Sequence, residues 1–287
     1  MSGLCPLCGS PAAGPGWIGA TSFDGRVYRY VECSGCRSLF SDPMPDAAAL
    51  SAMYGRSYRR DDDAEEGPRD LSTLRRWLSA RPPGVILDFG CGNGAVLELA
   101  RAQGWTAMGV EWDPAVCAEV ERRTGCRVLP RSGIDALARG GVDAVHLGDV
   151  IEHLTDPAAE LADVLPLLKP GGTLLAQGPL EANANVFTMV LRAARRLGVG
   201  RPVADMPPYH VVLATSAGQR RFFARLGLTV LGYDVTEVAW PAPARLRLAL
   251  LRQPRAAALF ALRRVSQLVS AVVPGWGNRY FFAGRRD

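Results

Sequence analysis

The 287-residue sequence has almost no lysine: Lys169 is the only one, so nearly all of its positive charge is arginine. The formal net charge is +5, but arginine richness is a nucleic-acid signature only when the charge is concentrated on one face. No stretch of roughly 18 uncharged apolar residues occurs, which argues against a membrane-spanning helix. The sequence opens without a basic segment followed by an apolar core, so we expect a cytoplasmic protein.

Cysteine is present in an odd number, seven, which without an export signal favours metal ligands and free thiols over disulfides. Four of these residues form two C-x-x-C pairs separated by 24 residues, and the sequence between the pairs alternates like β-strands. Two such pairs can supply the tetrahedron of thiolates that structural zinc requires, and a unit this small needs the metal to fold. We therefore predict a zinc ribbon over residues 1–42 with four ligands: Cys5, Cys8, Cys33 and Cys36.

Two alternatives to structural zinc stay open. The first is that the cysteines form a redox-active dithiol, which the sequence context does not favour because it is not thioredoxin-like. The second is that the ribbon folds as a small packed lobe without metal. The three remaining cysteines fall in or near predicted strands and helices, where buried, unreactive thiols are usual: Cys91, Cys117 and Cys126.

Residues 43–82 are interpreted as a helical linker. A helix is expected over 46–53 and another over 68–80, where Pro82-Pro83-Gly84 ends the pattern. Tyr54 follows the first helix and either packs or leans over a neighbouring site. The acidic run 61–66 is interpreted as a solvated loop.

A nucleotide-binding strand, turn and helix begins at Val85. The residues to Asp88 form a short apolar strand, and Gly90-Cys-Gly92-Asn-Gly94 forms a tight turn before a helix. Glycine lets the chain turn sharply and lets a cofactor approach the backbone. The turn also fits the looser dinucleotide fingerprint. Asp88 favours another cofactor, because its carboxylate would repel a pyrophosphate but attract the ammonium of an aminoacyl group.

The following strands continue an alternating α/β pattern. Strand 107–110 ends in Glu111, which is positioned to accept hydrogen bonds from ribose hydroxyls, and Trp112 could pack on an adenine. Strands at 142–147 and 173–177 follow, with helices between them. This order predicts an α/β fold with a doubly wound, mostly parallel sheet.

Four successive segments resemble the motifs of class I S-adenosylmethionine (SAM)-dependent methyltransferases: LDFGCGNG, GVEWDP, VDAVHLGDVIEHLTDP and LKPGGTLLAQGP. The chain resembles in particular a bacterial subfamily in which a four-cysteine ribbon precedes the catalytic domain, including enzymes that act on sugars, polysaccharides and secondary metabolites. The resemblance implies SAM as cofactor and a Rossmann-like domain, which we assign to residues 83–287. Within this domain we expect a lid-like segment at 180–215 and an amphipathic helical insertion at 241–275 before the last strand.

The resemblance assigns SAM binding to four matching positions: Asp88, Gly90, Gly92 and Glu111. It places Gly148 and Asp149 on the opposite wall of the cofactor site. Their neighbours complete the predicted cofactor site: Phe89, Cys91, Asn93 and Trp112. Many relatives have an acidic residue after the third strand to meet the adenine amino group. Here the segment 129–135 departs from that pattern, and the adenine contact is expected through Ser132, Gly133 or Ile134 instead.

Three histidines are the candidates for a general base. Methyl transfer depends mainly on geometry, but an alcohol acceptor must lose a proton, which suits histidine. His146 lies within an apolar strand and is interpreted as structural. His153 follows the carboxyl end of that strand, where it either reaches the acceptor or caps a helix. His210, in a proline-rich loop, faces substrate if the loop is a lid and is otherwise a surface residue.

The C-terminal region carries nine arginines from Pro241 onward and one acidic residue, Asp287. An apolar helical stripe is expected there: Leu259, Leu262, Val265, Val269 and Val272. Polar residues are expected opposite it: Arg263, Arg264, Gln267 and Ser270. The helix either packs on the domain, pairs two subunits in a homodimer, or lies at a membrane surface. Peripheral contact with the inner face of the membrane would suit a lipid-linked acceptor.

Three classes of function follow. We favour a SAM-dependent methyltransferase of a small-molecule or glycan acceptor, acting on oxygen of a sugar or secondary metabolite. An rRNA methyltransferase with a zinc module would bind RNA through arginines in a salt-sensitive way, but the acidic run and the scarcity of lysine weigh against nucleic acid. A non-catalytic SAM-binding protein would bind cofactor without turnover.

Overall fold

The computed structural model describes residues 3–56, 71–199, 203–238 and 253–287. The chain divides into two compact units, each assembled from separated segments. The first unit comprises residues 1–46, 179–222 and 234–280, and the second comprises residues 47–178, 223–233 and 281–287. Among the helices in these described ranges, none is long and apolar enough to cross a membrane. The acidic run 61–66 lies outside the described residues.

The first unit contains a five-stranded sheet in the order β10-β3-β2-β1-β9. Its N-terminal part is an antiparallel meander in which β1 pairs with β2 and β2 with β3. Later segments of the chain complete the sheet, because β10 pairs with β3 and β9 with β1. The strands span Ala12–Phe23 (β1), Arg26–Cys33 (β2), Leu39–Asp42 (β3), Val203–Asp205 (β9) and Val212–Leu213 (β10); the helices span Val186–Arg196 (α7), Ser216–Ala224 (α8) and Pro254–Ser270 (α9).

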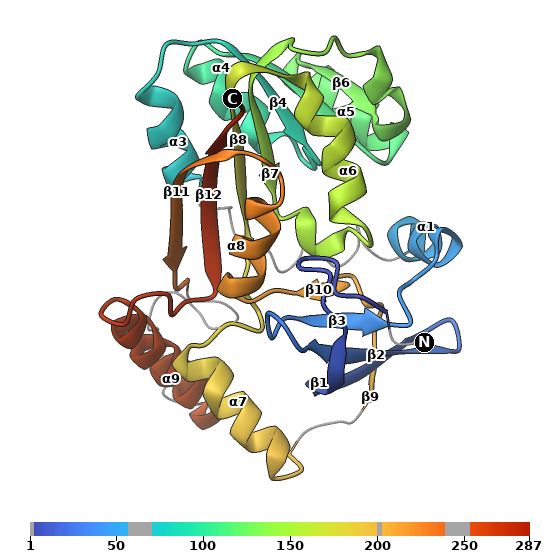
Figure 1. Ribbon diagram of the computed structural model, residues 1–287, viewed down its shortest axis with the longest axis vertical. Helices are drawn as coiled ribbons and strands as arrows, with labels where there is room; N and C mark the ends of the chain where they lie inside the picture. Colours follow the sequence, from blue (N-terminus) through green and yellow to red (C-terminus); the bar gives the residue numbers. More distant parts are fainter. Residues whose placement is uncertain (1–2, 57–70, 200–202, 239–252) are drawn as a thin grey trace. The chain divides into compact units, whose positions relative to one another are not determined.

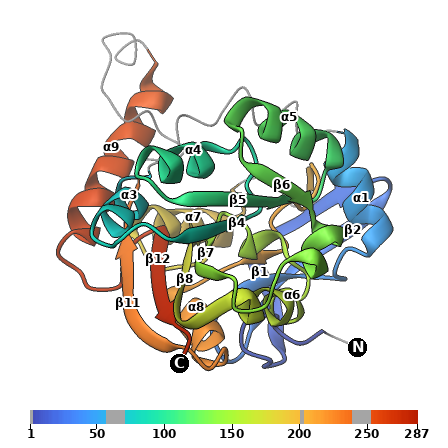
Figure 2. The same ribbon diagram turned by 90° about the horizontal axis from the view of Figure 1, so that it is seen from above.

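The second unit is built on a seven-stranded sheet in the order β11-β12-β8-β7-β4-β5-β6 (Figure 1). The pairs β4 with β5, β5 with β6, β4 with β7 and β7 with β8 are parallel. Helices α4 and α5 cover one face and α6 covers the other (Figure 2), so the sheet is doubly wound as predicted. The strands span Val85–Phe89 (β4), Thr106–Glu111 (β5), Arg127–Pro130 (β6), Val142–Gly148 (β7), Leu168–Pro179 (β8), Thr229–Thr236 (β11) and Arg279–Arg285 (β12); the helices span Ala47–Arg56 (α1), Ser72–Ser79 (α3), Ala95–Ala102 (α4), Pro114–Thr124 (α5) and Pro157–Val164 (α6).

Local sequence explains the edges of these helices. Asp113 caps α5 by accepting a hydrogen bond from the Ala115 backbone, and Gly125 ends the helix with φ of 64°. Asp156 caps α6 in the same way. The apolar faces of α3, α4 and α5 pack with β4 and β5 into one core that includes the thiols Cys91, Cys117 and Cys126, which are buried as predicted.

The division of the chain differs from the predicted ribbon, linker and single domain over 83–287. Part of the segment predicted as a lid supplies β9 and β10 to the sheet of the N-terminal ribbon, where Val212 pairs with Phe40. Helix α1 belongs to the second unit and not to a separate linker. These groupings depend on pairing between segments that lie far apart in the sequence.

The predicted amphipathic pattern of the C-terminal helix is wrong at some positions and holds at others, since Arg264 is exposed and Leu259, Leu262 and Val269 are half-buried. In α9, Arg263 is 4% exposed and Ser266 is fully buried, whereas Val265 and Leu268 are 49% and 71% exposed. The polar side chains face inward because Glu237 meets them there: Ser266 Oγ donates to Glu237 Oε1 over 2.9 Å, and Arg263 lies 3.4 Å from the same oxygen. The buried carboxylate of Glu237 therefore draws Arg263 inward, contrary to the expected position of this residue on the polar face. The first part of the predicted insertion, 241–252, lies outside the described residues.

Candidate active site and metal centre

The predicted cofactor residues gather where the parallel strands β4, β5 and β7 end. In open α/β sheets the carboxyl ends of the strands form the edge at which ligands bind. Asp88 on β4 lies opposite Gly109 on β5 and opposite His146 on β7. Glu111 ends β5. The structure thus brings the glycine turn after β4 and the acidic residue at the end of β5 to the same edge.

The glycine turn after β4 requires its glycines. Gly90, Gly92 and Gly94 have φ of 80°, 49° and 74°, a region that residues with a Cβ rarely adopt. A Cβ on Gly90 would lie 2.6 Å from Val150 Cγ2, whereas one on Gly92 would meet nothing within 4 Å. The backbone at Gly92 therefore borders open space, which is the approach that a nucleotide cofactor needs.

Glu111 connects the end of β5 to this turn. Its carboxylate accepts hydrogen bonds from the backbone N–H of Gly92 over 2.9 Å and of Trp112 over 2.7 Å. Trp112 is 43% exposed, and its ring packs edge-on against Phe89, with ring centroids 5.1 Å apart. A carboxylate and an exposed aromatic ring beside open backbone are suited to hold a ribose and a nucleobase.

Asp88 is paired with a residue that the sequence marked only as structural. Its Oδ1 lies 2.7 Å from His146 Nδ1, and the two residues are 2% and 1% exposed. Gly148 makes room for the imidazole, since a Cβ there would lie 2.7 Å from His146 Cε1. His146 therefore holds the buried carboxylate in one orientation at the end of β4. The register of β4 against β7 was the missing signal, because it sets these two residues side by side.

The remaining predicted cofactor residues lie along the same edge. Ser132 and Gly133 fall in the short 3-10 helix Arg131–Ala136 that follows β6. Gly148 is the last residue of β7, and Asp149 follows it with φ of 56°, an unusual backbone for a residue with a Cβ. The Asp149 N–H donates to Gln177 O over 2.9 Å. Cys91 is buried and Asn93 lies in the glycine turn.

His153 lies just beyond the end of β7, in the short 3-10 helix Ile151–His153. Its Nδ1 is 2.9 Å from the hydroxyl of Tyr54, which comes from α1. The two rings meet edge-on with centroids 6.1 Å apart. Tyr54, which follows the first predicted helix, is thus a hydrogen-bond partner of the candidate base His153.

His210 belongs to the first unit. Its Nδ1 lies 2.8 Å from Glu181 Oε2, and its backbone carbonyl accepts a hydrogen bond from the Tyr30 hydroxyl over 2.6 Å. The side chain is 33% exposed. These contacts anchor His210 to the sheet of its own unit, and its predicted catalytic role stays a prediction.

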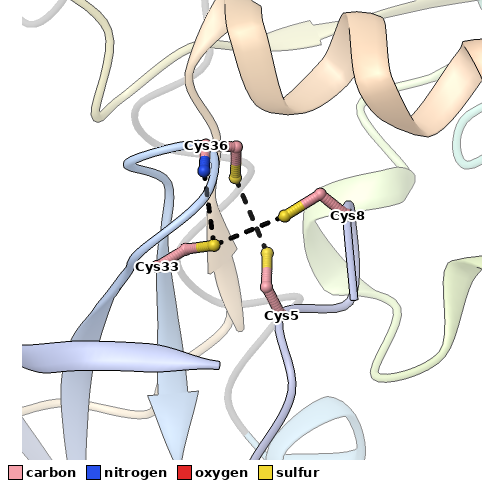
Figure 3. A group of neighbouring side chains, drawn as sticks. All are labelled: Cys5, Cys8, Cys33 and Cys36. Carbon is pink, nitrogen blue, oxygen red and sulfur yellow. Dashed lines mark hydrogen bonds between the residues drawn. The ribbon is translucent and has the colours of Figure 1, made fainter. Parts of the chain in front are cut away.

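The four predicted metal ligands of the first unit converge on one point (Figure 3). Cys5 Sγ lies 3.7 Å from Cys36 Sγ, and Cys8 Sγ lies 3.4 Å from Cys33 Sγ. A zinc tetrahedron with Zn–S bonds of about 2.3 Å has S–S edges of about 3.8 Å. The four sulfur atoms therefore fit a closed Zn²⁺ site, and backbone N–H groups of Gly35 and Cys36 donate to Cys33 Sγ over 3.3 and 3.4 Å.

The pKa of one cluster cysteine, Cys36, is shifted in the opposite direction from that of Cys91 in the second unit. The pKa of Cys36 is lowered to about 5, chiefly by its hydrogen bond with Cys5, while the pKa of Cys5 is raised by the same bond and by burial. Such a cluster holds a thiolate at neutral pH, and thiolates are the form that binds metal. By contrast, burial and the carboxylates of Asp88 and Glu111 raise the pKa of Cys91.

Comparison with known proteins agrees with this fold. A family model described as a methyltransferase domain matches residues 59–231. A SAM-dependent methyltransferase from Archaeoglobus fulgidus has a TM-score of 0.53 and 17% identity, over 80% of this chain and 100% of that one. A second similar structure is the 1,6-didemethyltoxoflavin-N1-methyltransferase of Burkholderia thailandensis, solved with 1,6-didemethyltoxoflavin and S-adenosylhomocysteine. It has a TM-score of 0.52 and 16% identity, over 93% of this chain and 99% of that one. No curated protein matches the chain.

The sheet, the glycine turn and the acidic strand ends define a Rossmann-like nucleotide-binding enzyme fold. Because the family model spans more than half of the chain, the protein belongs to the class I SAM-dependent methyltransferases. The solved structures, at below 25% identity, support the fold. The predicted family and fold class are thereby confirmed.

Proposed function

We propose that the protein transfers the methyl group of SAM to an oxygen atom of a small-molecule or glycan acceptor, such as a sugar or secondary metabolite. The observation that carries this proposal is the Tyr54–His153 hydrogen bond beyond the end of β7. An oxygen acceptor must lose a proton, and a positioned histidine at the ligand-binding edge of the sheet suits that task.

The tautomer of His153 decides whether it can act as a base. If Nδ1 carries the proton and donates it to the Tyr54 hydroxyl oxygen, the lone pair lies on Nε2, which can then accept the acceptor's proton. Tyr54 thereby acts as a positioning residue for His153. The loss of the acceptor proton to Nε2 leaves an alkoxide-like oxygen as the nucleophile.

The residues at the end of β4 and β5 fit SAM in chemistry as well as in arrangement. Asp88, held by His146, presents negative charge for the ammonium of the amino acid part, and Glu111 presents acceptors for the ribose hydroxyls. Trp112 offers an exposed ring for the adenine. Bound SAM supplies an electrophilic methyl group on a sulfonium. The protein's task is to hold the acceptor in line with it and to exclude water.

We also propose that the four-cysteine cluster holds a structural Zn²⁺. Its donor set and sulfur spacing are those of a closed tetrahedral site without an open position for substrate. Freshly purified protein should contain about one zinc per chain. Protein that is folded with all four thiols free and without metal would contradict this assignment.

Calorimetric titration with SAM and S-adenosylhomocysteine tests the cofactor site. Asp88→Asn and Glu111→Gln should each weaken binding by about tenfold or more, because each removes a charge-assisted contact worth about 1.5–3 kcal/mol. Glu119→Gln, at an exposed position on α5, is the matched control and should bind like wild type. Failure of the folded wild-type protein to bind either ligand would overturn the proposal.

Screening of glycans and hydroxylated metabolites for S-adenosylhomocysteine release then tests the acceptor class. With a responsive acceptor, His153→Gln should lower kcat by about 10²–10⁴-fold without weakening SAM binding. Tyr54→Phe should lower kcat less and shift its pH profile. Unchanged turnover in His153→Gln would exclude this histidine as the base.

A further inference from the structure

Two neighbouring helices of the first unit leave apolar faces exposed. Helices α7 and α9 lie side by side (Figure 1). On α9 the exposed apolar residues recur at alternating spacings of three and four and continue just past its end: Ala258, Ala261, Val265, Leu268 and Val272. The last two are 71% and 78% exposed. This spacing places them on one face of the helix.

Helix α7 and the residues after it show a second exposed apolar face. Met189 and Val190 are 53% and 45% exposed, and Leu197 and Val199, beyond the helix end, are 82% and 61% exposed. Large apolar side chains concentrated on exposed helix faces usually mark an interaction site. We refer to the exposed apolar residues of α7 and α9, with those just beyond each helix, as the α7–α9 surface.

The interior side of α9 explains why its apolar residues point outward. Arg263 and Glu237 are almost completely buried, and the guanidinium also stacks on Phe187, 3.2 Å from the ring centroid. Burial lowers the pKa of Arg263 to about 10, so the arginine remains charged at neutral pH. A buried ion pair of this kind contributes less to stability than apolar packing of similar volume. Polar side chains thus occupy interior positions of α9, while Val265 and Leu268 face outward.

Charge indicates what this surface binds. The sequence contains no acidic residue over 186–199 or 238–286. Exposed arginines flank both apolar faces: Arg196 on α7 and Arg264 on α9. In a twofold dimer formed by these two segments, neither arginine would meet an acidic side chain of the same segments in the second copy. An anionic lipid surface supplies both an apolar layer and negative charge.

We propose that the α7–α9 surface binds anionic membranes peripherally, with apolar side chains of both helices entering the boundary between headgroups and acyl chains. Arg196 and Arg264 contact the lipid phosphates from the flanks. This property is independent of the acceptor of the methyl group, and it can be tested without any enzymatic assay.

Sedimentation of the full-length, zinc-loaded protein with vesicles is the test. Vesicles of phosphatidylcholine with one third phosphatidylglycerol should bind the protein at least about tenfold more tightly than phosphatidylcholine alone, and added salt should weaken the binding. Leu268→Ser and Leu197→Ser should each weaken it by about tenfold, since each removes a buried leucine from the lipid. Arg264→Gln should weaken it about fivefold.

Val230→Ser is the matched control, because Val230 is 54% exposed on β11, outside the α7–α9 surface, and should bind vesicles like wild type. Equal binding to both kinds of vesicle, or equal loss in the control, would overturn the proposal. So would a reversible dimer, seen by analytical ultracentrifugation, that Leu268→Ser dissociates. Loss of folding stability in Leu268→Ser without loss of vesicle binding would likewise show that this residue packs against the protein.

Discussion

The Asp88–His146 pair makes a quantitative prediction about the end of β4. His146→Leu removes an imidazole that is 2.7 Å from Asp88 Oδ1 and leaves a carboxylate that is 2% exposed. A buried acceptor left without its partner costs about 1–3 kcal/mol of folding free energy. Since leucine has a similar volume to histidine, loss of packing adds little, and we expect the free energy of unfolding to fall by about that amount.

A double-mutant cycle separates the pair from its surroundings. Asp88→Ala should also destabilise the protein, because His146 Nδ1 then loses its partner. The double variant should lose less unfolding free energy than the two single variants together, because it leaves no buried polar group opposite an apolar one. We expect a coupling energy of about 1–3 kcal/mol.

Urea unfolding followed by circular dichroism measures each free energy through its midpoint and slope. Strict additivity of the two single substitutions would refute the reasoning, because it would mean that the two side chains do not interact in solution. A His146→Leu variant as stable as wild type would refute it as well.

Three further predictions concern the turn, its cysteine and the metal. Gly90→Ala should lower the free energy of unfolding, measured in urea, by more than Gly140→Ala does. Both glycines have positive φ, a backbone conformation that costs an alanine about 1–2 kcal/mol. Only at Gly90 would the added Cβ also meet a neighbour, Val150 Cγ2 at 2.6 Å. Cys91, whose pKa is raised, stays a protonated thiol at pH 8, so mass spectrometry after iodoacetamide treatment should find it unmodified. Chelation of zinc, or Cys33→Ser, should lower the calorimetric unfolding temperature, and an unchanged temperature would argue against a structural metal.

The sequence predicts the sheet and its ligand-binding edge because the signals are local. The strand ending in Asp88, the turn containing Gly90 and Gly92, and the acidic end of the next strand lie close together in the chain, and each has a pattern specific to its structure. The two C-x-x-C pairs are similarly specific, since four thiols at that spacing have few other uses.

Two features escaped prediction because they depend on distant pairings. The Asp88–His146 contact joins residues 58 positions apart and depends on the register of β4 against β7. The outward face of α9 depends on Glu237, which lies 26 positions before Arg263. A prediction from helical periodicity assumes that charged residues face solvent. This assumption fails for Arg263, because the buried carboxylate of Glu237 pairs with it.

The same pairings link the cysteine cluster to a segment far along the chain. The Thr215 hydroxyl donates to Cys36 O over 2.7 Å, and the Thr215 N–H donates to Ser38 Oγ over 3.0 Å. Gly218 fits there because a Cβ would lie 2.3 Å from Ser38 Oγ and 3.2 Å from Cys36 Sγ. The second C-x-x-C pair thus supports the beginning of α8, at Ser216. A metal that fixes Cys36 would therefore also order the start of this helix, which gives the ribbon a role in holding the first unit together.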